Sequence, residues 1–343
     1  MDWADSEIIE AVRAGGPVAQ RAVERTGLTR VTISRRLARL VEQGFVSRKG
    51  AGTRPTYSAG DKLWWQKRWE RQALAADGEG EGEIWLAHVA PIVTALPPNV
   101  RNIVHIGFTE MLNNAIDHAQ SSHISCSLLA DAEVVQIAVV DDGVGIFRRI
   151  ADHLTLPDKR LAILELAKGK FTTAAEGHSG MGVFVCSRMF DRFTIHSDGL
   201  VFTHDHDFTF DWLDAGHQET GTTVLMEIAR RSARTSTSVY DRYFDPDQSG
   251  PDAFLITEVP LRLAALGSDL VSRSQGKWVT ARIDQFRRAI LDFEGVTGVG
   301  QGFVDEVFRV FALAHPQVDL VAMNMSDEVA RVVKMFAPRN TAL

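Results

Sequence analysis

Glu110 and Asn114 are four residues apart in a stretch whose apolar spacing predicts one long amphipathic helix, over residues 100–119. Side chains four apart share one face of a helix, so both can reach the same ligand. An amide oxygen is a hard ligand suited to Mg²⁺, and a carboxylate can orient a water molecule for attack. The pair alone is a weak signal, because Glu and Asn at this spacing occur on many solvated helices.

A second group of residues could recognise a purine ring. The apolar run at residues 134–140 predicts a buried strand, and Asp141, Gly143 and Gly145 follow it directly. Glycines let the backbone approach a flat ring closely, and a buried carboxylate can accept a hydrogen bond from the exocyclic amine of adenine. We therefore predict that Asp141 reads adenine.

A third group could hold phosphates. Gly177, Gly180 and Gly182 precede an apolar helix that we predict over residues 183–190. Glycine amides at the start of a helix can form a phosphate cradle, although a lone glycine cluster is more often a turn. Thr222, at the start of a later predicted strand, could return a hydroxyl to the same phosphates.

These four motifs, in this order across residues 84–229, resemble the GHKL ATPase superfamily, which includes gyrase B, MutL, heat-shock chaperones, histidine kinases and anti-sigma-factor kinases. The resemblance implies a Bergerat-type α/β sandwich, with helices on one face of a mixed sheet and ATP and Mg²⁺ under a flexible lid. It implies that Glu110 is the water-activating base, Asn114 the Mg²⁺ ligand and Asp141 the adenine reader. It also implies ATP-binding positions at Gly143, Gly145, Gly177, Gly180, Gly182 and Thr222.

The lid implied by this resemblance covers roughly residues 147–182 and contains three lysines, Lys159, Lys168 and Lys170. Lys170 is closest to the glycine turn, so we rank it first for contact with a γ-phosphate. Lysines in a mobile loop are more often solvated, and this alternative stays open.

Charge separates the front of the chain from the rest. Residues 1–71 hold 14 Lys and Arg against 8 Asp and Glu, a net charge of +6. The whole chain of 343 residues carries −7, so the remainder carries −13. A basic module on an acidic protein favours a polyanionic partner for the module, although a solvated basic surface is the alternative.

Helices predicted at residues 6–14 and 18–25, a third beginning at Thr29 or Thr32, and two strands around a glycine-rich tip at 50–52 indicate a winged helix-turn-helix. Residues 37–46 resemble the end of the recognition helix in bacterial regulators of this class. Such a helix enters the major groove of DNA while the wing meets phosphates. We expect groove contacts from Thr29, Arg30, Thr32, Ser34 and Arg35, and backbone contacts from Arg48, Lys49 and Arg54. A module that contacts only protein is the alternative.

Near the C-terminus, a strand at 289–293, a helix at 303–315, a strand at 318–323 and a helix at 327–336 predict a small α/β layer. Residues 291–306 resemble STAS-like domains of an uncharacterised subfamily found fused to GHKL ATPases. In anti-sigma systems a GHKL kinase phosphorylates a serine in the corresponding loop of a STAS partner. Here the loop holds Gly300, Gln301 and Gly302, with no hydroxyl nearer than Thr297, so self-phosphorylation is not expected.

The sequence therefore predicts a multidomain protein. We expect a winged helix-turn-helix domain at 1–62, a tryptophan-bearing helical linker and Gly/Glu hinge at 63–83, a GHKL ATP-binding domain at 84–230, a linker at 231–252 and a STAS-like domain at 253–343. Cys126 and Cys186 have no second cysteine or histidine at ligand spacing, so we read them as packing residues. With no export signal and no membrane-spanning run, we expect a cytoplasmic protein.

The function that these features favour is an ATP-binding, slowly ATP-hydrolysing, DNA-binding transcriptional regulator. A serine/threonine protein kinase of the anti-sigma type and a nucleotide-gated protein-interaction scaffold are the alternatives. A protein partner for the C-terminal domain and the pairing of two copies of the chain stay open.

Overall fold

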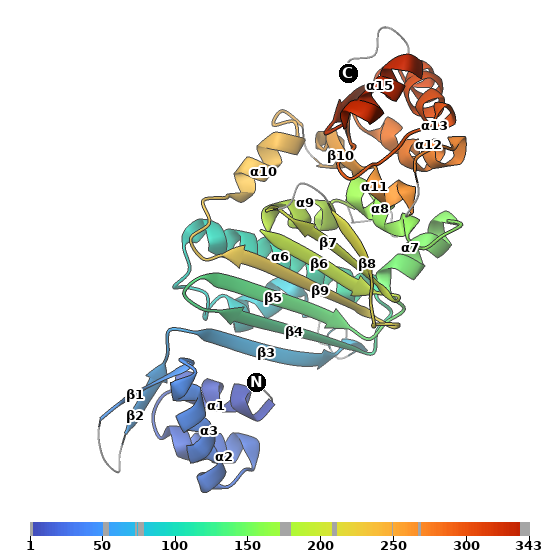
Figure 1. Cartoon of the computed structure of the whole chain (residues 1–343). Coiled ribbons are helices and arrows are strands. Elements are labelled where there is room, and N and C mark those ends of the chain that lie inside the picture. Colours follow the sequence, from blue (N-terminus) through green and yellow to red (C-terminus); the bar gives the residue numbers. More distant parts are fainter. Residues whose placement is uncertain are drawn as a thin grey trace.

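The structure is a computed structural model and describes residues 3–50, 55–72, 74, 79–171, 180–207, 211–248, 250–266 and 269–336. A large central sheet separates two smaller parts of the chain (Figure 1). The N-terminal part lies beside β3 at one edge of this sheet. The C-terminal part lies at the opposite side, beyond α8 and α9.

The central sheet has seven strands in the order β3-β4-β5-β9-β6-β7-β8. They are β3 (Leu63–Glu70), β4 (His123–Ala130), β5 (Val134–Asp141), β9 (Thr222–Ala229), β6 (Arg192–Ser197), β7 (Leu200–Asp205) and β8 (Trp212–Ala215). Every neighbouring pair is antiparallel, so the mixed sheet implied by the family resemblance is wrong for this chain. In β4 and β5 half-buried and buried residues alternate, because successive side chains point to opposite faces.

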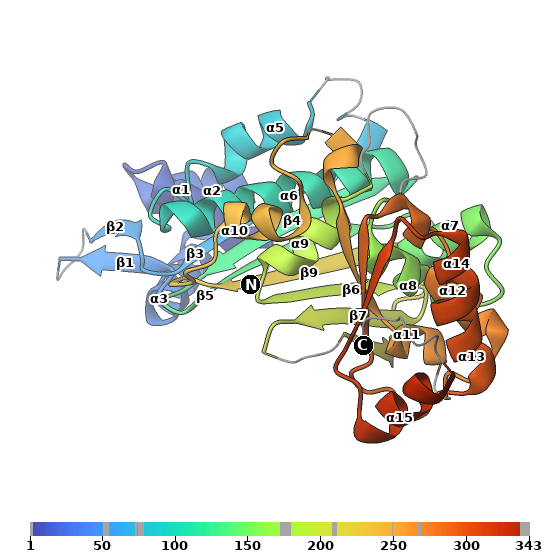
Figure 2. The same ribbon diagram turned by 90° about the horizontal axis from the view of Figure 1, so that it is seen from above.

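Helices α6 (Pro98–His118) and α9 (Gly182–Met189) cover one face of the sheet (Figure 2). The long helix predicted over 100–119 is thus confirmed, and Pro98 sits in its first turn, where proline is tolerated. Phe108 and Leu112 of α6 are fully buried. Two shorter helices, α7 (Ile146–Leu154) and α8 (Leu161–Lys168), follow β5 and lie at the end of the sheet nearest the C-terminal part.

The helical linker predicted at 63–83 is wrong, because Leu63–Glu70 is the edge strand β3, paired with β4. Trp65 and Trp69 are four residues apart, a spacing that places two side chains on one face of a strand as well as on one face of a helix. Both are buried in the central core, whereas Trp64 packs against the N-terminal part. The Gly/Glu hinge is also partly wrong, since Glu81–Ile84 forms helix α5, followed by the π-helical turn η1 (Trp85–Val89).

The N-terminal part contains the three predicted helices and the predicted hairpin. These are α1 (Trp3–Arg13), α2 (Val18–Thr26), α3 (Arg30–Glu42), β1 (Val46–Lys49) and β2 (Thr56–Ala59). Their apolar side chains form a core of their own, around Ile8, Ile33 and Leu37. Thr29 caps α3, because its hydroxyl accepts a hydrogen bond from the amide of Thr32.

The C-terminal part is built on three parallel strands in the order β10-β11-β12. Its elements are η2 (Gly250–Ala253), β10 (Ile256–Pro260), α11 (Arg262–Ala265), α12 (Arg273–Thr280), η3 (Ile283–Gln285), β11 (Arg288–Asp292), α13 (Gln301–Asp305), η4 (Glu306–Phe311), α14 (Ala312–Ala314), β12 (Asp319–Met323) and α15 (Asp327–Phe336). The four predicted elements are confirmed. Its buried side chains belong to the same continuous core as those of the central sheet.

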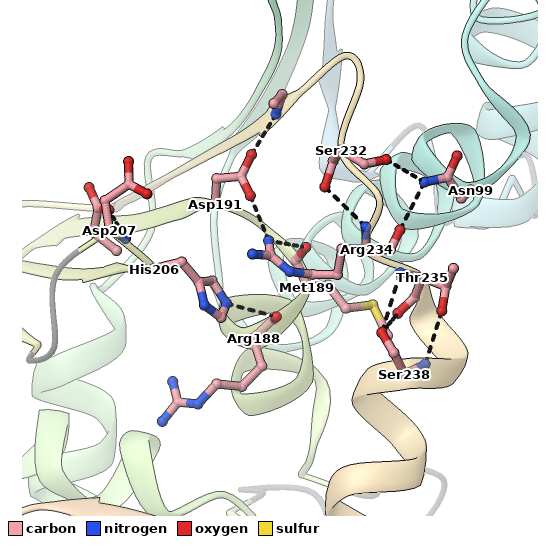
Figure 3. Close-up of polar contacts among 12 residues, drawn as sticks. Asn99, Arg188, Met189, Asp191, His206, Asp207, Ser232, Arg234, Thr235 and Ser238 are labelled. Atoms are coloured by element: carbon pink, nitrogen blue, oxygen red, sulfur yellow. Dashed lines mark hydrogen bonds and ion pairs between the residues drawn. The ribbon is translucent and has the colours of Figure 1, made fainter.

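The predicted linker at 231–252 is an ordered connection that contains α10 (Ser236–Tyr243). Asn99 of α6 donates hydrogen bonds to the carbonyl oxygens of Ser232 and Arg234, at 2.7 and 2.9 Å. Figure 3 shows Arg234 reaching back to Met189, the last residue of α9, and to Asp191 just after it. The two hydrogen bonds are 3.1 and 2.7 Å. These contacts fix the start of the connection to the helices behind the sheet.

Candidate functional site

Residues from seven described helices and strands converge on one cavity beside α6: α6 itself, α7, α8, α9, β5, β6 and β9. The cavity has a volume of about 1080 Å³, including the part that is open to solvent. Seven of the predicted site residues line it: Glu110, Asn114, Asp141, Gly145, Gly180, Gly182 and Thr222. Gly143 and Lys170 do not line it, and Gly177 lies outside the described residues.

At one end of the cavity, Glu110 and Asn114 project from the same face of α6. Glu110 is exposed and Asn114 is half-buried. A Cβ atom added to Gly182, the first residue of α9, would lie 2.3 Å from Oε2 of Glu110. Glycine at this position therefore allows the carboxylate of Glu110 to lie close to the beginning of α9, where the helix presents backbone amides.

At the other end of the cavity, Asp141 is buried where β5 pairs with β9. Its Oδ1 accepts hydrogen bonds from the amides of Gly143 and Thr222, at 2.9 and 3.2 Å. Burial raises the pKa of Asp141 to about 6, because desolvation disfavours the charged carboxylate more than these two bonds favour it. The side chain of Thr222 also hydrogen-bonds to this carboxylate. A carboxylate has about four acceptor positions, so Asp141 can still accept a hydrogen bond from a ligand.

The glycines after Asp141 serve the close packing of the backbone. A Cβ atom on Gly143 would lie 2.0 Å from the carbonyl oxygen of Ala119, at the end of α6. Gly145 has a φ of +90°, and a Cβ atom there would lie 2.5 Å from the carboxylate oxygens of Asp198. Gly143 therefore brings the loop against α6 and lines no part of the cavity, whereas Gly145 lines it directly.

Ser197 and Asp198 hold this loop, and no motif in the sequence indicates their role. Asp198 is fully buried in the turn between β6 and β7, and its Oδ2 accepts a 3.0 Å bond from the amide of Arg148. The amide of Ile146 donates to Ser197 Oγ at 3.1 Å and to Thr222 Oγ1 at 3.2 Å. The hydroxyl of Thr222 thus supports the loop that carries Gly145. In sequence, residues 197–199 read only as a turn.

Arg149 adds a positive charge to the cavity. It extends from α7, is half-buried, lines the cavity and donates a hydrogen bond to the carbonyl oxygen of His118, at the end of α6. In the sequence, Arg149 is part of a basic pair at 148–149, which is typical of a solvated helix surface and does not indicate a site.

The three lysines considered for a γ-phosphate all contact other parts of the protein. Lys159 donates to the carbonyl oxygen of Asp198. Lys168 is completely buried and pairs with Glu165 at 2.6 Å. Lys170 donates to the carbonyl oxygen of Gln285 at 2.8 Å, in the C-terminal part, so its ammonium is directed away from the cavity.

The residues predicted to contact DNA are spread over the surface of α3 and the hairpin. Thr29, Arg30, Ser34, Arg35, Arg48 and Lys49 are exposed, Thr32 is half-buried, and Arg54 lies outside the described residues. Two other arginines of α3, Arg36 and Arg39, pair with the buried Asp5 at 2.8 and 2.6 Å and so hold α1 against α3.

The donors at the cavity fit a magnesium nucleotide better than a bare metal ion. Within the described ranges, no three His, Cys, Asp or Glu side chains are grouped to hold a metal. Mg²⁺ in nucleotide sites usually takes one or two protein oxygens and completes its octahedron with phosphates and water. Asn114 supplies such an oxygen.

Among the described helices, none is both long and apolar enough to cross a membrane.

Comparison with protein families identifies two segments of the chain. Residues 85–203 match the family model of the histidine kinase-like ATPase domain. Residues 275–330 match the family model of a STAS-like domain of unknown function. No curated protein matches the chain. The chain therefore combines a GHKL-type ATPase domain with a STAS-like domain, as the sequence motifs predict. Thr222 lies beyond the matched ATPase residues, and the pairing of β9 with β5 brings it to the cavity.

Proposed function

We propose that this protein is a regulator that binds ATP with Mg²⁺ in the cavity beside α6, hydrolyses it slowly, and binds DNA through its N-terminal module. The observation that carries the proposal is the meeting of Glu110, Asn114, Asp141 and Thr222 in one cavity, although the sequence separates them by up to 112 residues. The match to the histidine kinase-like ATPase domain supports it.

The two ends of the cavity suit the two ends of ATP. Asp141 would accept a hydrogen bond from the exocyclic amine of adenine, with Gly145 beside the ring. The triphosphate would then extend toward Gly180 and Gly182, and Asn114 would hold Mg²⁺ against the phosphates. Bound Mg²⁺ would neutralise charge on the phosphate oxygens. Arg149 supplies a fixed positive charge near the end of α6.

Glu110 is the proposed general base. Its carboxylate is exposed and lies near the beginning of α9, so a water molecule could bind between it and a terminal phosphate. Glu110 would accept a proton from this water as its oxygen attacks phosphorus, and ADP would leave. Hydrolysis needs no further protein group in this scheme, which suits slow turnover in a regulatory switch.

Transfer of phosphate to a protein is the second candidate, favoured by the STAS-like domain in the same chain. In anti-sigma systems such domains are substrates of GHKL kinases. Thr297 has the hydroxyl nearest in sequence to the glycine loop, and this hydroxyl donates a 2.8 Å hydrogen bond to Asp269. Neither residue lines the cavity, so we favour hydrolysis or a separate protein substrate.

The experiment for the nucleotide site compares Glu110→Ala with Asn114→Ala. Glu110→Ala should lower the rate of phosphate release by about 10²–10⁴-fold and leave the affinity for a non-hydrolysable ATP analogue unchanged. Asn114→Ala should weaken only the Mg²⁺-dependent part of binding. Radiolabelled ATP separates free phosphate from phosphoprotein. A Glu110→Ala protein that hydrolyses ATP like the wild type contradicts the assignment of the base.

The N-terminal module is proposed as a winged helix-turn-helix that binds DNA. Its support is the net charge of +6 over residues 1–71 and the exposure of Arg30 and Arg35 on α3, with Arg48 and Lys49 on the hairpin. Arginine in the major groove can form paired hydrogen bonds to guanine, while hairpin cations meet phosphates.

The DNA experiment uses genomic fragments captured by the protein, followed by fluorescence anisotropy across salt concentration. About five phosphate contacts give a log–log slope of about −4 to −5. Arg35→Ala should lose preference between sequences, and Lys49→Ala should weaken all sequences alike. If no DNA is captured at low salt, the module is a protein-binding module and the scaffold alternative gains support.

A further inference from the structure

Helix α8 carries a buried ionic group at the junction with the C-terminal part. All eight residues of α8 are buried. Glu165 and Lys168, one turn apart, are 3% and 0% exposed and pair at 2.6 Å. The ammonium of Lys168 also donates to the carbonyl oxygens of Trp278 and Ala281, at 2.6 and 3.0 Å. Each buried charge thus has partners, which is the condition for such a group to be tolerated.

Arg282 completes this group from the C-terminal part and makes three contacts with the ATPase domain. Its guanidinium pairs with Glu165 at 2.6 Å and donates to the carbonyl oxygen of Gly169 at 2.8 Å. It also lies over the ring of Phe171, 5.2 Å from its centre. Arg282 itself adopts a φ of 63°, an uncommon conformation for a residue other than glycine.

The segment that Arg282 holds belongs to the wall of the cavity. Leu166 and Phe171 both line it, on either side of Gly169. Phe171 is fixed further, because its amide donates to the carbonyl oxygen of Gly180 at 3.1 Å, and Gly180 lines the proposed phosphate end. Gly169 is held closely as well, since a Cβ atom there would lie 2.6 Å from the ring of Phe254.

A second contact from the C-terminal part reaches α9. Glu258 of β10 lies 3.4 Å from Nε of Arg188, which is almost completely buried. Figure 3 shows the carbonyl of Arg188 bonded to His206, with the guanidinium directed away from that histidine. Arg188 is on the helix that begins with Gly182. The C-terminal part therefore touches the chain both before and after the glycine turn of the site.

We infer that Arg282 is a positioning residue of the nucleotide site, through which the STAS-like domain sets the affinity for the triphosphate. The inference rests on the proposed function. Arg282 does not line the cavity. It acts through Gly169 and Phe171, whose places determine the shape of the phosphate end. The adenine end, set by Asp141 and Thr222, is held by β5 and β9 and has no contact with Arg282 in the described structure.

The experiment compares three variants of the full chain by calorimetry with Mg²⁺ and either ADP or a non-hydrolysable ATP analogue. Arg282→Ala and Arg282→Lys remove the planar group that bridges Glu165, Gly169 and Phe171. Each should weaken binding of the ATP analogue by about tenfold, with a smaller effect on ADP, as is typical for coupling between two sites. The matched control is Arg288→Ala, which breaks an exposed 2.7 Å pair with Asp319 in the same domain and should leave both affinities unchanged.

The preference for the ATP analogue over ADP is the readout that distinguishes positioning from general destabilisation. A residue needed only for folding would lower thermal stability and leave this preference unchanged in the folded fraction. If Arg282→Ala does not fold, Arg282→Lys decides, because it keeps a cation beside Glu165. Folded Arg282→Lys with the wild-type preference overturns the inference. Absence of nucleotide binding by the wild-type protein overturns the proposed function instead.

Discussion

Trp64 and Lys168 lie at the two junctions of the central sheet, and their surroundings differ. At the N-terminal junction, the Trp64 indole donates a 2.9 Å bond to Ser6, and its carbonyl accepts a 2.5 Å bond from Arg13. The N-terminal module keeps a core separate from that of the sheet. At the C-terminal junction, Lys168 is buried among charges from both sides, and one core runs through the sheet and the STAS-like domain.

This difference indicates which module responds to nucleotide. The helical linker and Gly/Glu hinge predicted at 63–83 would have connected the N-terminal module to the ATPase domain through a mobile segment. The structure has a sheet strand at 63–70 instead, and no residue of this strand lines the cavity. The STAS-like domain touches the wall of the cavity through Arg282. We therefore expect binding of nucleotide to affect the C-terminal domain first.

The largest expected effect is that of deleting the C-terminal part, and deletion of the N-terminal module is the comparison. Removal of residues 253–343 takes away Phe254, which packs against Phe184 and Phe244. Exposure of this core should abolish the cooperative unfolding of the ATPase domain. Removal of residues 1–62 should leave a folded protein that binds nucleotide. Thermal unfolding followed by circular dichroism, with size-exclusion chromatography, measures both. A folded ATPase domain without residues 253–343 would contradict the shared core.

The buried ionic group tests the same junction with one side chain. Glu165→Gln leaves Lys168 and Arg282 without their carboxylate, and loss of one partner of a buried pair costs about 3–5 kcal/mol in the free energy of unfolding. Asp319→Asn removes an exposed pair with Arg288 and should cost less than about 1 kcal/mol. Urea denaturation of both variants gives the comparison. Equal costs would mean that the group at α8 does not hold the junction.

Two buried aspartates allow a residue of the nucleotide site to be compared with a residue that only stabilises the fold. Asp141 has a pKa of about 6 in the folded protein, above the ordinary 3.8. Above pH 6 its buried carboxylate is ionised, and this charge lowers the free energy of unfolding. The destabilisation disappears as the pH falls from 6 toward 3.8, because the folded protein then holds the proton. Asp141→Asn should therefore stabilise the nucleotide-free protein at pH 7.5 by about 1–3 kcal/mol, with no gain at pH 4. The same change should weaken ATP binding by about 1–3 kcal/mol.

The control for Asp141 is Asp5, which is also buried but pairs with Arg36 and Arg39. Asp5→Asn loses charge-assisted bonds and should destabilise the N-terminal module at pH 7.5. Urea denaturation and calorimetry with ATP separate the two outcomes. If both variants lose stability, Asp141 is a structural residue and its assignment to adenine is wrong.

The smallest effect is expected at the N-terminal junction. Ser6→Ala removes the acceptor of the Trp64 indole and should cost about 0.5–1.5 kcal/mol in stability. Nucleotide affinity should not change, because no cavity-lining residue lies near this bond. Calorimetry with the ATP analogue provides the check. A change in affinity of the Ser6→Ala protein would show that the N-terminal junction is coupled to the site after all.

Much of the fold could be predicted from local patterns. Helix α6, strand β5 and the helices of the N-terminal module have clear periodicities and end signals in the sequence. Strand β3 was mistaken for a helix because Trp65 and Trp69 fit both periods. Helix α10 is not predicted because the segment 231–252 has few apolar residues. Val239 and Tyr243 of α10 are buried, and Tyr243 packs on Phe184 of α9.

The residues of the candidate site also fall into those that could be predicted from the sequence and those that could not. Asp141 and Gly182 belong to short motifs in which residue type and spacing carry the chemistry, so they could be predicted. Asp198 and Arg149 contribute through the approach of segments far apart in the sequence, which no local pattern encodes. Lys170 is predicted to contact a γ-phosphate because it is near the glycine turn in sequence. Its ammonium instead lies over the ring of Phe286 and donates a hydrogen bond to the carbonyl oxygen of Gln285, both in the C-terminal domain.

The short connection between β2 and β3 has a mechanical consequence. Only Gly60, Asp61 and Lys62 separate Ala59 from Leu63, and a span of this length reaches about 10 Å when extended. Its ends are also bonded inward, because the amides of Gly60 and Lys62 donate to the carbonyl oxygens of Phe45 and Gly44. The N-terminal module, although separate in its core, is therefore oriented by the edge of the sheet. A dye attached to α2 should report the slow rotational diffusion of the whole chain, and any bound DNA would hold that edge in a fixed direction.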